Sequence, residues 1–189
     1  MTPFRAPIDD ILLAISATRT DDAFDQDLAN EILNHFARFA DEVIAPIDEI
    51  GDREGCRLED GRVKLPDLFL RAYQSYCDQG WHTLSLPAEY DGQGVPALIA
   101  GAVSEMLAGA CHSFQMITGL VPGAARVIAQ FGEDDQRRKW LPALSSGKYL
   151  ATMCLTEPQA GSDLSEIRTV ARQDAKGNWT LHGEKIFIS

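Results

Sequence analysis

The stretch Leu155-Thr156-Glu157-Pro158-Gln159-Ala160-Gly161-Ser162-Asp163 decides how the rest of this chain is interpreted. It predicts a strand that runs into a tight turn. Pro158 cannot donate a hydrogen bond to a β ladder, and Gly161 permits either a positive φ or the close approach of a ligand. Backbone N–H groups in such a turn can hold an anion.

The side chains of this turn leave two interpretations open. The hydroxyls of Thr156 and Ser162 can donate to a carbonyl, a ring nitrogen or a phosphate, which favours a ligand site. The same composition is also typical of an ordinary hydroxyl-rich turn, in which Glu157 and Asp163 face solvent.

The sequence on both sides of the turn predicts β structure. Residues 149–155 are expected to form a strand, residues 167–173 and 179–188 alternate apolar and polar positions, and residues 174–178 form a turn around Gly177. The change in pattern begins after Gly147.

The preceding sequence has helical periodicity instead. A long amphipathic helix is predicted over 22–44, with Asp21 or Asp22 as its N-cap and Pro46 closing it. Residues 48–64 are predicted to form a charged loop, and a helix follows from Pro66 to a C-terminal glycine at Gly80.

Three further helices complete this part of the prediction. Residues 96–111 are almost wholly apolar or small and predict a buried central helix after the turn-rich loop at 86–94. Another helix is expected over about 113–131. A short one is capped by Glu133 or Asp134, runs through Trp140 and is closed by Pro142.

The fold class predicted is therefore α+β, with an all-α helical domain followed by the first strands of an antiparallel β domain. The predicted domains are an N-terminal arm over 1–20, a helical domain over 21–147 and the start of a β domain over 148–189. The arm is expected to be extended and to lead into a brief helix or bend.

Composition narrows the classes of function. The 189 residues are 45% hydrophobic and 24% charged, with 28 acidic and 17 basic residues and a formal charge of −11. This excess of negative charge argues against nucleic acid as a partner and against binding to an anionic membrane. No apolar run is long enough for a membrane helix, so no membrane insertion is expected.

The cysteines and histidines predict neither a disulfide framework nor a metal site. The four cysteines, Cys56, Cys77, Cys111 and Cys154, form no C-x-x-C pair, and no two histidines are spaced at i, i+4. Buried free thiols and a reducing cytoplasmic location are the expectation.

Four segments, in order, resemble the acyl-CoA dehydrogenase family: residues 86–94, 131–147, 155–163 and 179–189. The segment 155–163 resembles the first motif of the family's β domain, and 179–189 resembles the second at the spacing the family uses. The opening Phe4-Arg5-Ala6-Pro7-Ile8-x-Asp10 is similar to the arm of a longer-chain subgroup that includes methylmercaptopropionyl-CoA dehydrogenases.

The resemblance implies an FAD enzyme that oxidises an acyl-CoA thioester to the trans-2-enoyl-CoA. A carboxylate removes the proton α to the thioester, and the β-hydrogen leaves as hydride to flavin N5. It also implies electron-transfer flavoprotein as the electron acceptor and a homodimer or homotetramer as the complete assembly. The family fold adds a second helical bundle, which these residues do not contain.

The resemblance also implies roles for individual residues at the flavin. Thr156 would bond the pyrimidine edge of the ring system. Phe187 would pack against it in place of a residue that is often tryptophan, and Ser189 would place a hydroxyl near N5 where the family usually has threonine. The complete set of implied cofactor-binding residues is Met153, Leu155, Thr156, Gly161, Ser162, Phe187 and Ser189.

Ser162 is additionally implied beside the FAD pyrophosphate or the CoA, as a substrate-binding residue. Gln159 stands where the family commonly has glycine, which predicts a stiffer turn.

No residue of the chain matches the family's catalytic glutamate, which lies beyond residue 189. Glu157 belongs to the turn, and Glu105 in mid-helix is more typical of a satisfied polar group than of a base. The 189 residues alone are therefore expected to be inactive.

Two alternatives remain open. One is a flavoprotein of the same fold with other chemistry, such as an acyl-CoA oxidase, a nitroalkane oxidase or a DNA-associated relative. The other is a non-catalytic module that binds a partner.

Overall fold

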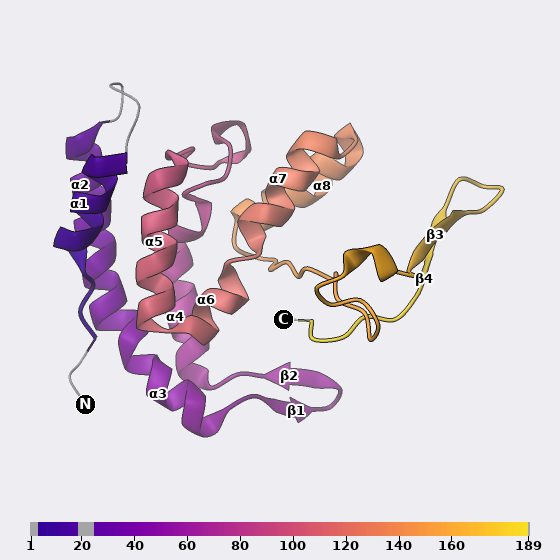
Figure 1. Ribbon diagram of the computed structural model, residues 1–189, viewed down its shortest axis with the longest axis horizontal. Coiled ribbons are helices and arrows are strands. Elements are labelled where there is room, and N and C mark those ends of the chain that lie inside the picture. The colour runs from indigo at the N-terminus through magenta and orange to yellow at the C-terminus, as the bar shows by residue number, and fades with distance from the viewer. Residues whose placement is uncertain (1–3, 19–24, 189) are drawn as a thin grey trace. The chain divides into compact units, whose positions relative to one another are not determined.

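The computed structural model describes residues 4–18 and 25–188, and the chain folds into two compact units that divide between Ala151 and Thr152 (Figure 1). The first unit is helical. The second contains a β-hairpin and the turn at 155–163. The predicted fold class, a helical domain followed by antiparallel strands, is confirmed.

The elements of the helical unit follow one another in this order: α1 (Ile8–Thr18), α2 (Gln26–Phe39), a π-helix η1 (Ala40–Ile44), α3 (Ala45–Glu54), β1 (Arg57–Glu59), β2 (Arg62–Lys64), α4 (Asp67–Asp78), η2 (Trp81–Thr83), η3 (Ala88–Tyr90), α5 (Ala97–Ala110), α6 (His112–Thr118), α7 (Val121–Phe131) and α8 (Asp134–Ser145). The second unit contains η4 (Leu164–Glu166), β3 (Val170–Gln173) and β4 (Trp179–His182).

Helix α5 lies at the centre of the helical unit, as its apolar sequence predicts, and α2 packs beside it (Figure 1). The side chains of Phe36 on α2, Phe114 on α6 and Trp81 all belong to this core. The rings of Phe36 and Trp81 are 4.9 Å apart at 81°, the edge-to-face arrangement that aromatic pairs prefer. A smaller cluster holds α7 to α8 through Val121, Leu141 and neighbouring apolar side chains.

The prediction that Pro46 closes the long helix is wrong. Helix α2 passes into the π-helix η1, and Pro46 lies in the first turn of α3, where its missing N–H costs little. The Ala45 N–H bonds the carbonyl of Ala40, five residues back, and this wider turn makes room for the proline ring.

The N-cap of α2 is Asp25, whose carboxylate accepts a hydrogen bond from the Leu28 N–H. The caps predicted at Asp21 and Asp22 lie outside the described residues.

The loop predicted over 48–64 is also wrong, because α3 continues to Glu54 and a short hairpin follows. In the hairpin Leu58 pairs with Val63, and both side chains are exposed. The many charged residues here reflect the solvent-exposed face of regular elements rather than a loop.

Two helix boundaries farther along also differ from the prediction, and each of these helices contains a proline. The single helix expected over 113–131 breaks at Gly119 into α6 and α7, since Pro122 again occupies a helix's first turn. The helix that starts at Glu133 has the predicted cap, as a capping box with Gln136, but continues through Pro142 to Ser145. Leu141 and Leu144 are both buried, so packing outweighs the lost backbone bond.

Residues 149–155 do not form the predicted strand. Their backbone is irregular, and within the described ranges no segment pairs with them as a β ladder. The two later alternating segments do pair, although both strands are shorter than predicted: β3 is antiparallel to β4 with Val170 opposite His182. The turn predicted at 174–178 is confirmed, with Gly177 at φ 85 and the Asp174 N–H bonded to the Asn178 carbonyl.

Residues 4–7 of the predicted arm lie outside regular secondary structure and lead into α1, a full helix whose Ile11 and Ile15 are buried in the main core. The arm is fixed to the π-helix through Asp41, which accepts hydrogen bonds from the Ala6 N–H at 3.0 Å and from the Arg5 guanidinium at 3.2 Å. In residues 4–18 and 25–188, no helix is both long enough and apolar enough to cross a membrane.

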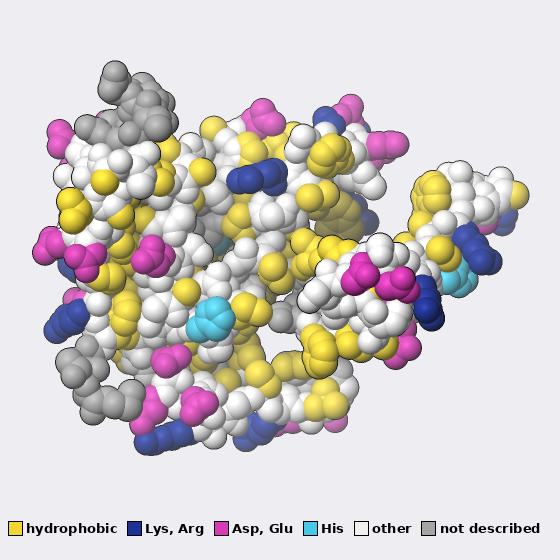
Figure 2. All heavy atoms as spheres, viewed as in Figure 1, with side chains coloured by type: hydrophobic (Ala, Val, Ile, Leu, Met, Phe, Trp, Pro, Cys, Tyr) yellow, Lys and Arg dark blue, Asp and Glu magenta, His cyan; other side chains and the backbone are white. Residues whose placement is uncertain are grey.

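On the face of the helical unit that Figure 2 shows, lysine and arginine side chains are scattered and form no single basic patch. The cysteines were expected to be buried. Cys111 is buried and Cys77 is half-buried, but Cys56 and Cys154 are exposed, so that expectation holds only in part.

Candidate functional site

The turn at residues 157–160 is closed by two backbone hydrogen bonds. The N–H of Glu157 donates to the carbonyl of Ala160, and the N–H of Ala160 donates back to Glu157, each at 3.0 Å. Pro158 occupies the second position of this turn, where its fixed φ is favourable. Ala160 is completely buried, which anchors the turn to its own unit.

Gly161 does not have the positive φ that was one of its two predicted uses. The second use, the close approach of another molecule, fits the structure: a Cβ at Gly161 would meet no atom within 4 Å. Space beside this backbone is therefore open.

Glu157 is not solvated, in contrast to the simpler of the two interpretations of the turn. It is 3% exposed. One carboxylate oxygen accepts hydrogen bonds from the Arg168 N–H at 2.8 Å and from Gln159 at 2.6 Å, and the other accepts from the Thr169 N–H at 3.0 Å and from Lys185 Nζ at 2.8 Å. The Lys185 ammonium, together with these N–H donors, holds the pKa of the Glu157 carboxyl well below its ordinary value.

Lys185 and Ile186 bring the second motif beside the first. Lys185 Nζ also donates to the carbonyl of Leu155 at 3.0 Å, and the Ile186 N–H donates to the carbonyl of Thr156 at 3.0 Å. Residues 155–157 and 185–186, about 30 positions apart, therefore lie side by side within the second unit.

Gln159 ties the turn to the next segment, donating to the Glu166 carbonyl at 3.1 Å as well as to Glu157. A glycine at this position has no side chain to make either bond. The stiffer turn remains a prediction.

The apolar candidates in this unit are open to solvent. Phe187 is 89% exposed, and Met153 and Leu155 are also exposed. Phe187 has a φ of 56, a left-handed conformation that is rare for an aromatic residue. The backbone of Phe187 is therefore in an unusual conformation directly after the segment that Lys185 and Ile186 fix.

The polar candidates have hydroxyls available for a ligand. Thr156 is half-buried and Ser162 is exposed, and within the described residues neither hydroxyl makes a protein hydrogen bond. Ser189, the remaining candidate, lies outside the described residues.

Sequence reasoning missed Glu157 and Lys185 as parts of this site. The available signal was Lys185 itself, a long cation that breaks the apolar alternation of 179–188 and requires a partner if it is not fully exposed.

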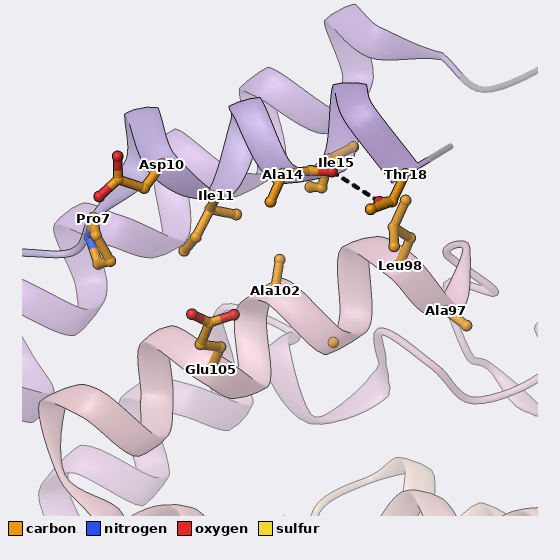
Figure 3. A pocket seen from close by; sticks show the side chains of 11 residues that line it. Pro7, Asp10, Ile11, Ala14, Ile15, Thr18, Ala97, Leu98, Ala102 and Glu105 are labelled. Carbon is orange, nitrogen blue, oxygen red and sulfur yellow. Dashed lines mark hydrogen bonds between the residues drawn. The ribbon is translucent and has the colours of Figure 1, made fainter. Parts of the chain in front are cut away.

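A groove of about 520 Å³ lies in the helical unit between α1 and α5 (Figure 3). Ile11 and Ala102 contribute to its apolar walls, and the carboxyl groups of Asp10 and Glu105 lie toward one end. Glu105 is exposed and makes no side-chain hydrogen bond to the described residues, so it is a solvated carboxylate rather than the satisfied group expected.

Comparison with known proteins identifies the family. The family model of the acyl-CoA dehydrogenase N-terminal domain matches residues 26–148, and that of the acyl-CoA dehydrogenase middle domain matches residues 152–189. The chain belongs to the acyl-CoA dehydrogenase family. The resemblance found in the four sequence segments is thereby confirmed, and both motifs of the candidate site lie in the part matched by the middle domain.

Individual acyl-CoA dehydrogenases support the same assignment. The chain is 40% identical to 3-methylmercaptopropionyl-CoA dehydrogenase of Ruegeria pomeroyi, over 98% of this chain and 33% of that protein. It is similar to the solved acyl-CoA dehydrogenase of Bacillus anthracis complexed with FAD, with a TM-score of 0.73 and 26% identity, over 97% of this chain and 31% of that one.

A chain in the solved structure of the electron-transferring flavoprotein of Acidaminococcus fermentans is also similar, with a TM-score of 0.67 and 26% identity, over 89% of this chain and 41% of that chain. The 189 residues thus span 31–41% of the length of these relatives.

Proposed function

We propose that this chain supplies the first part of the flavin site of an FAD-dependent acyl-CoA dehydrogenase, which oxidises an acyl-CoA to the trans-2-enoyl-CoA. The observation that carries the proposal is the meeting of the two motifs, in which Lys185 and Ile186 bond the backbone of Leu155 and Thr156. When bound, FAD supplies the hydride acceptor for the β-hydrogen of the substrate.

The features of the second unit fit a flat, largely apolar ring system with polar edges. Met153, Leu155 and Phe187 offer exposed apolar surface, and the space beside Gly161 is open. The free hydroxyl of Thr156 would donate to the pyrimidine edge of the ring, and that of Ser162 would lie at the pyrophosphate or the CoA. Ser189 would add a hydroxyl near flavin N5.

The residues of this chain bind and orient, and the proton at the α-carbon is removed by a base from elsewhere. The two carboxylate oxygens of Glu157 accept hydrogen bonds from four donors, so neither oxygen is available to a substrate. The Lys185 ammonium beside it favours the anionic form of the carboxyl group. We propose that the base belongs to sequence beyond residue 189 and that residues 1–189 alone give no turnover.

Other features are proposed from the same family membership. The helical domain would extend over 21–147 after an arm at 1–20, and the β domain would begin at 148. The partners would be an acyl-CoA, electron-transfer flavoprotein and further copies of the same chain, in a cytoplasmic location. The similar protein of Ruegeria pomeroyi makes a thioether-containing acyl-CoA a good first substrate to test.

The test uses the complete protein after removal of bound flavin. Thr156→Ala removes one donor to the ring and should weaken FAD affinity about fivefold, which corresponds to about 1 kcal/mol for a single hydrogen bond. Thr180→Ala is the matched control, because Thr180 is an exposed threonine on β4 whose hydroxyl donates to a backbone carbonyl.

FAD titration and reduction of an artificial acceptor by acyl-CoA report the result. A wild-type protein that binds no FAD contradicts the proposed function. Equal affinities of wild type and Thr156→Ala contradict only the role of Thr156.

A further inference from the structure

The buried carboxylate of Glu157 joins three segments of the second unit. It belongs to the turn, it accepts the N–H groups of Arg168 and Thr169, and it pairs with Lys185. The Glu157 side chain is 2% exposed and that of Lys185 is 22% exposed. A carboxylate this deeply buried is tolerated only with full compensation, and here the compensation comes from residues that are far apart in sequence.

Each residue of the pair is close in sequence to one of the proposed flavin contacts. Thr156 immediately precedes Glu157, and Phe187 follows Lys185 by two residues. Lys185 Nζ bridges the Glu157 carboxylate and the Leu155 carbonyl, and the next N–H, of Ile186, bonds the Thr156 carbonyl. The ion pair and the backbone bond together fix the separation between the segment with Thr156 and the segment with Phe187.

The conformation of Phe187 gives an independent sign of restraint. A left-handed φ of 56 in an exposed aromatic residue is unfavourable by itself and persists only where the neighbouring chain imposes it. The hydrogen bonds of Lys185 and Ile186 are those restraints on its N-terminal side.

We propose that Glu157 and Lys185 are positioning residues, which act together to set Thr156 and Phe187 at the separation that the flavin ring requires. This inference rests on the proposed function, because it concerns the same flavin site. Neither side chain touches the flavin in this proposal. Each acts through the backbone that it holds.

If Glu157 and Lys185 served only to stabilise the unit, their loss would affect unfolding but not the flavin site. The double variant distinguishes this role from a positioning role. Lys185→Met alone leaves Glu157 buried without its cation, which should destabilise the unit whatever its role. Glu157→Gln combined with Lys185→Met removes both charges, so it relieves the penalty of a buried unpaired charge, although the amide keeps only one of the two accepting oxygens. The bridge from Lys185 to Leu155 is still lost.

The complete protein is compared as wild type, Lys185→Met and the double variant. Glu166→Gln with Lys176→Met is the matched control, since it makes the same charge changes on two exposed side chains of the same unit. Thermal unfolding, the dissociation constant for FAD, and the absorption spectrum and reduction potential of the bound flavin are measured for each.

We expect the double variant to unfold at a higher temperature than Lys185→Met yet to bind FAD at least about tenfold more weakly than the wild type, with an altered flavin spectrum and potential, because a site loses affinity when its supporting residues are removed. The control should match the wild type. A folded double variant with wild-type affinity, spectrum and potential overturns the inference while the proposed function stands. A wild-type protein that binds no FAD overturns the proposed function itself.

A second variant, Glu157→Asp, tests the inference if the double variant does not fold. Glu157→Asp keeps the charge and shortens the side chain by one methylene, so the carboxylate cannot reach all its donors without movement of the turn. We expect a folded protein with weakened FAD binding and a shifted potential. Wild-type values for both in Glu157→Asp overturn the inference.

Discussion

Gly147 follows the last helix of the helical unit in a left-handed conformation that is costly for other residue types. Gly147→Ala should destabilise that unit by an amount that can be worked out in two parts. Its φ is +69, and a Cβ at this position would lie 2.6 Å from Cys77 Sγ. The Gly147 carbonyl also accepts a hydrogen bond from the Tyr73 hydroxyl at 2.7 Å, so the backbone cannot move away freely.

The left-handed conformation costs alanine about 1 kcal/mol relative to glycine. The overlap with sulfur adds about 1–3 kcal/mol, the usual penalty for inserting a methyl group into a packed site. The total expected loss in the free energy of unfolding is therefore about 2–4 kcal/mol.

The second part of this cost depends on Cys77 and can be isolated. Cys77→Ala removes Sγ and leaves Cys77 Cβ at 3.4 Å from the new methyl group, an ordinary contact distance. In the Cys77→Ala background Gly147→Ala should cost only the conformational part, so a double-mutant cycle should give a coupling of about 1–3 kcal/mol.

Urea unfolding followed by far-UV circular dichroism measures all four proteins. Gly101→Ala serves as the control, because Gly101 is a helical glycine on α5 where an added methyl group would meet no atom within 4 Å, and alanine there should stabilise by up to about 1 kcal/mol. A Gly147→Ala cost that stays the same with and without Cys77 would show that the sulfur contact is not its cause.

Two further predictions test the core and the buried carboxylate. Phe36→Ala should lower the free energy of unfolding by about 3–5 kcal/mol, since Phe36 is completely buried and packs edge-to-face on Trp81; exposed Leu13→Ala on α1 is the control, and equal urea midpoints for the two would contradict the assigned core. The depressed pKa of Glu157 means that its stabilising contribution is complete above the unfolded pKa of about 4.3 and is lost as pH falls toward the folded pKa. The amide NMR signals of Arg168 and Thr169 should therefore stay constant on acidification to about pH 4.3 and change only below it; a midpoint at the ordinary glutamate value would contradict the arrangement, and Glu157→Gln should abolish the transition.

The sequence predicted the helical unit well where periodicity and termination signals agree. The buried helix α5, the left-handed Gly80 after α4 and the cap at Glu133 are as expected. The errors concentrate at prolines: Pro46, Pro122 and Pro142 all lie within helices or their first turns. A proline in the sequence shows only that one backbone N–H is missing. Whether a helix can still form there depends on its packing against other elements, which the local sequence does not specify.

The candidate site was predictable in its residue types but not in its connections. The turn at 157–160 and the later hairpin of β3 and β4 follow from Pro158, Gly161 and the alternating segments, whereas the strand predicted before the turn does not form. The burial of Glu157 does not, because a glutamate before a proline is usually solvated, and its partners Arg168, Thr169 and Lys185 come from two later segments. Local propensity cannot report a contact that tertiary structure creates.

The ion pair between Glu157 and Lys185 makes the motif at 155–163 and the motif at 179–189 depend on each other. The first motif contributes a carboxylate that is costly to bury and the second contributes the lysine that compensates it, so neither segment has a stable buried arrangement without the other. Lys185→Met should therefore disturb the first motif, about 30 residues away, while an equally drastic change at the exposed Lys176 should leave it intact. Chemical shifts of the Glu157–Ala160 backbone would decide between these outcomes, and an unperturbed turn in Lys185→Met would mean that the first motif is stable by its own two backbone bonds.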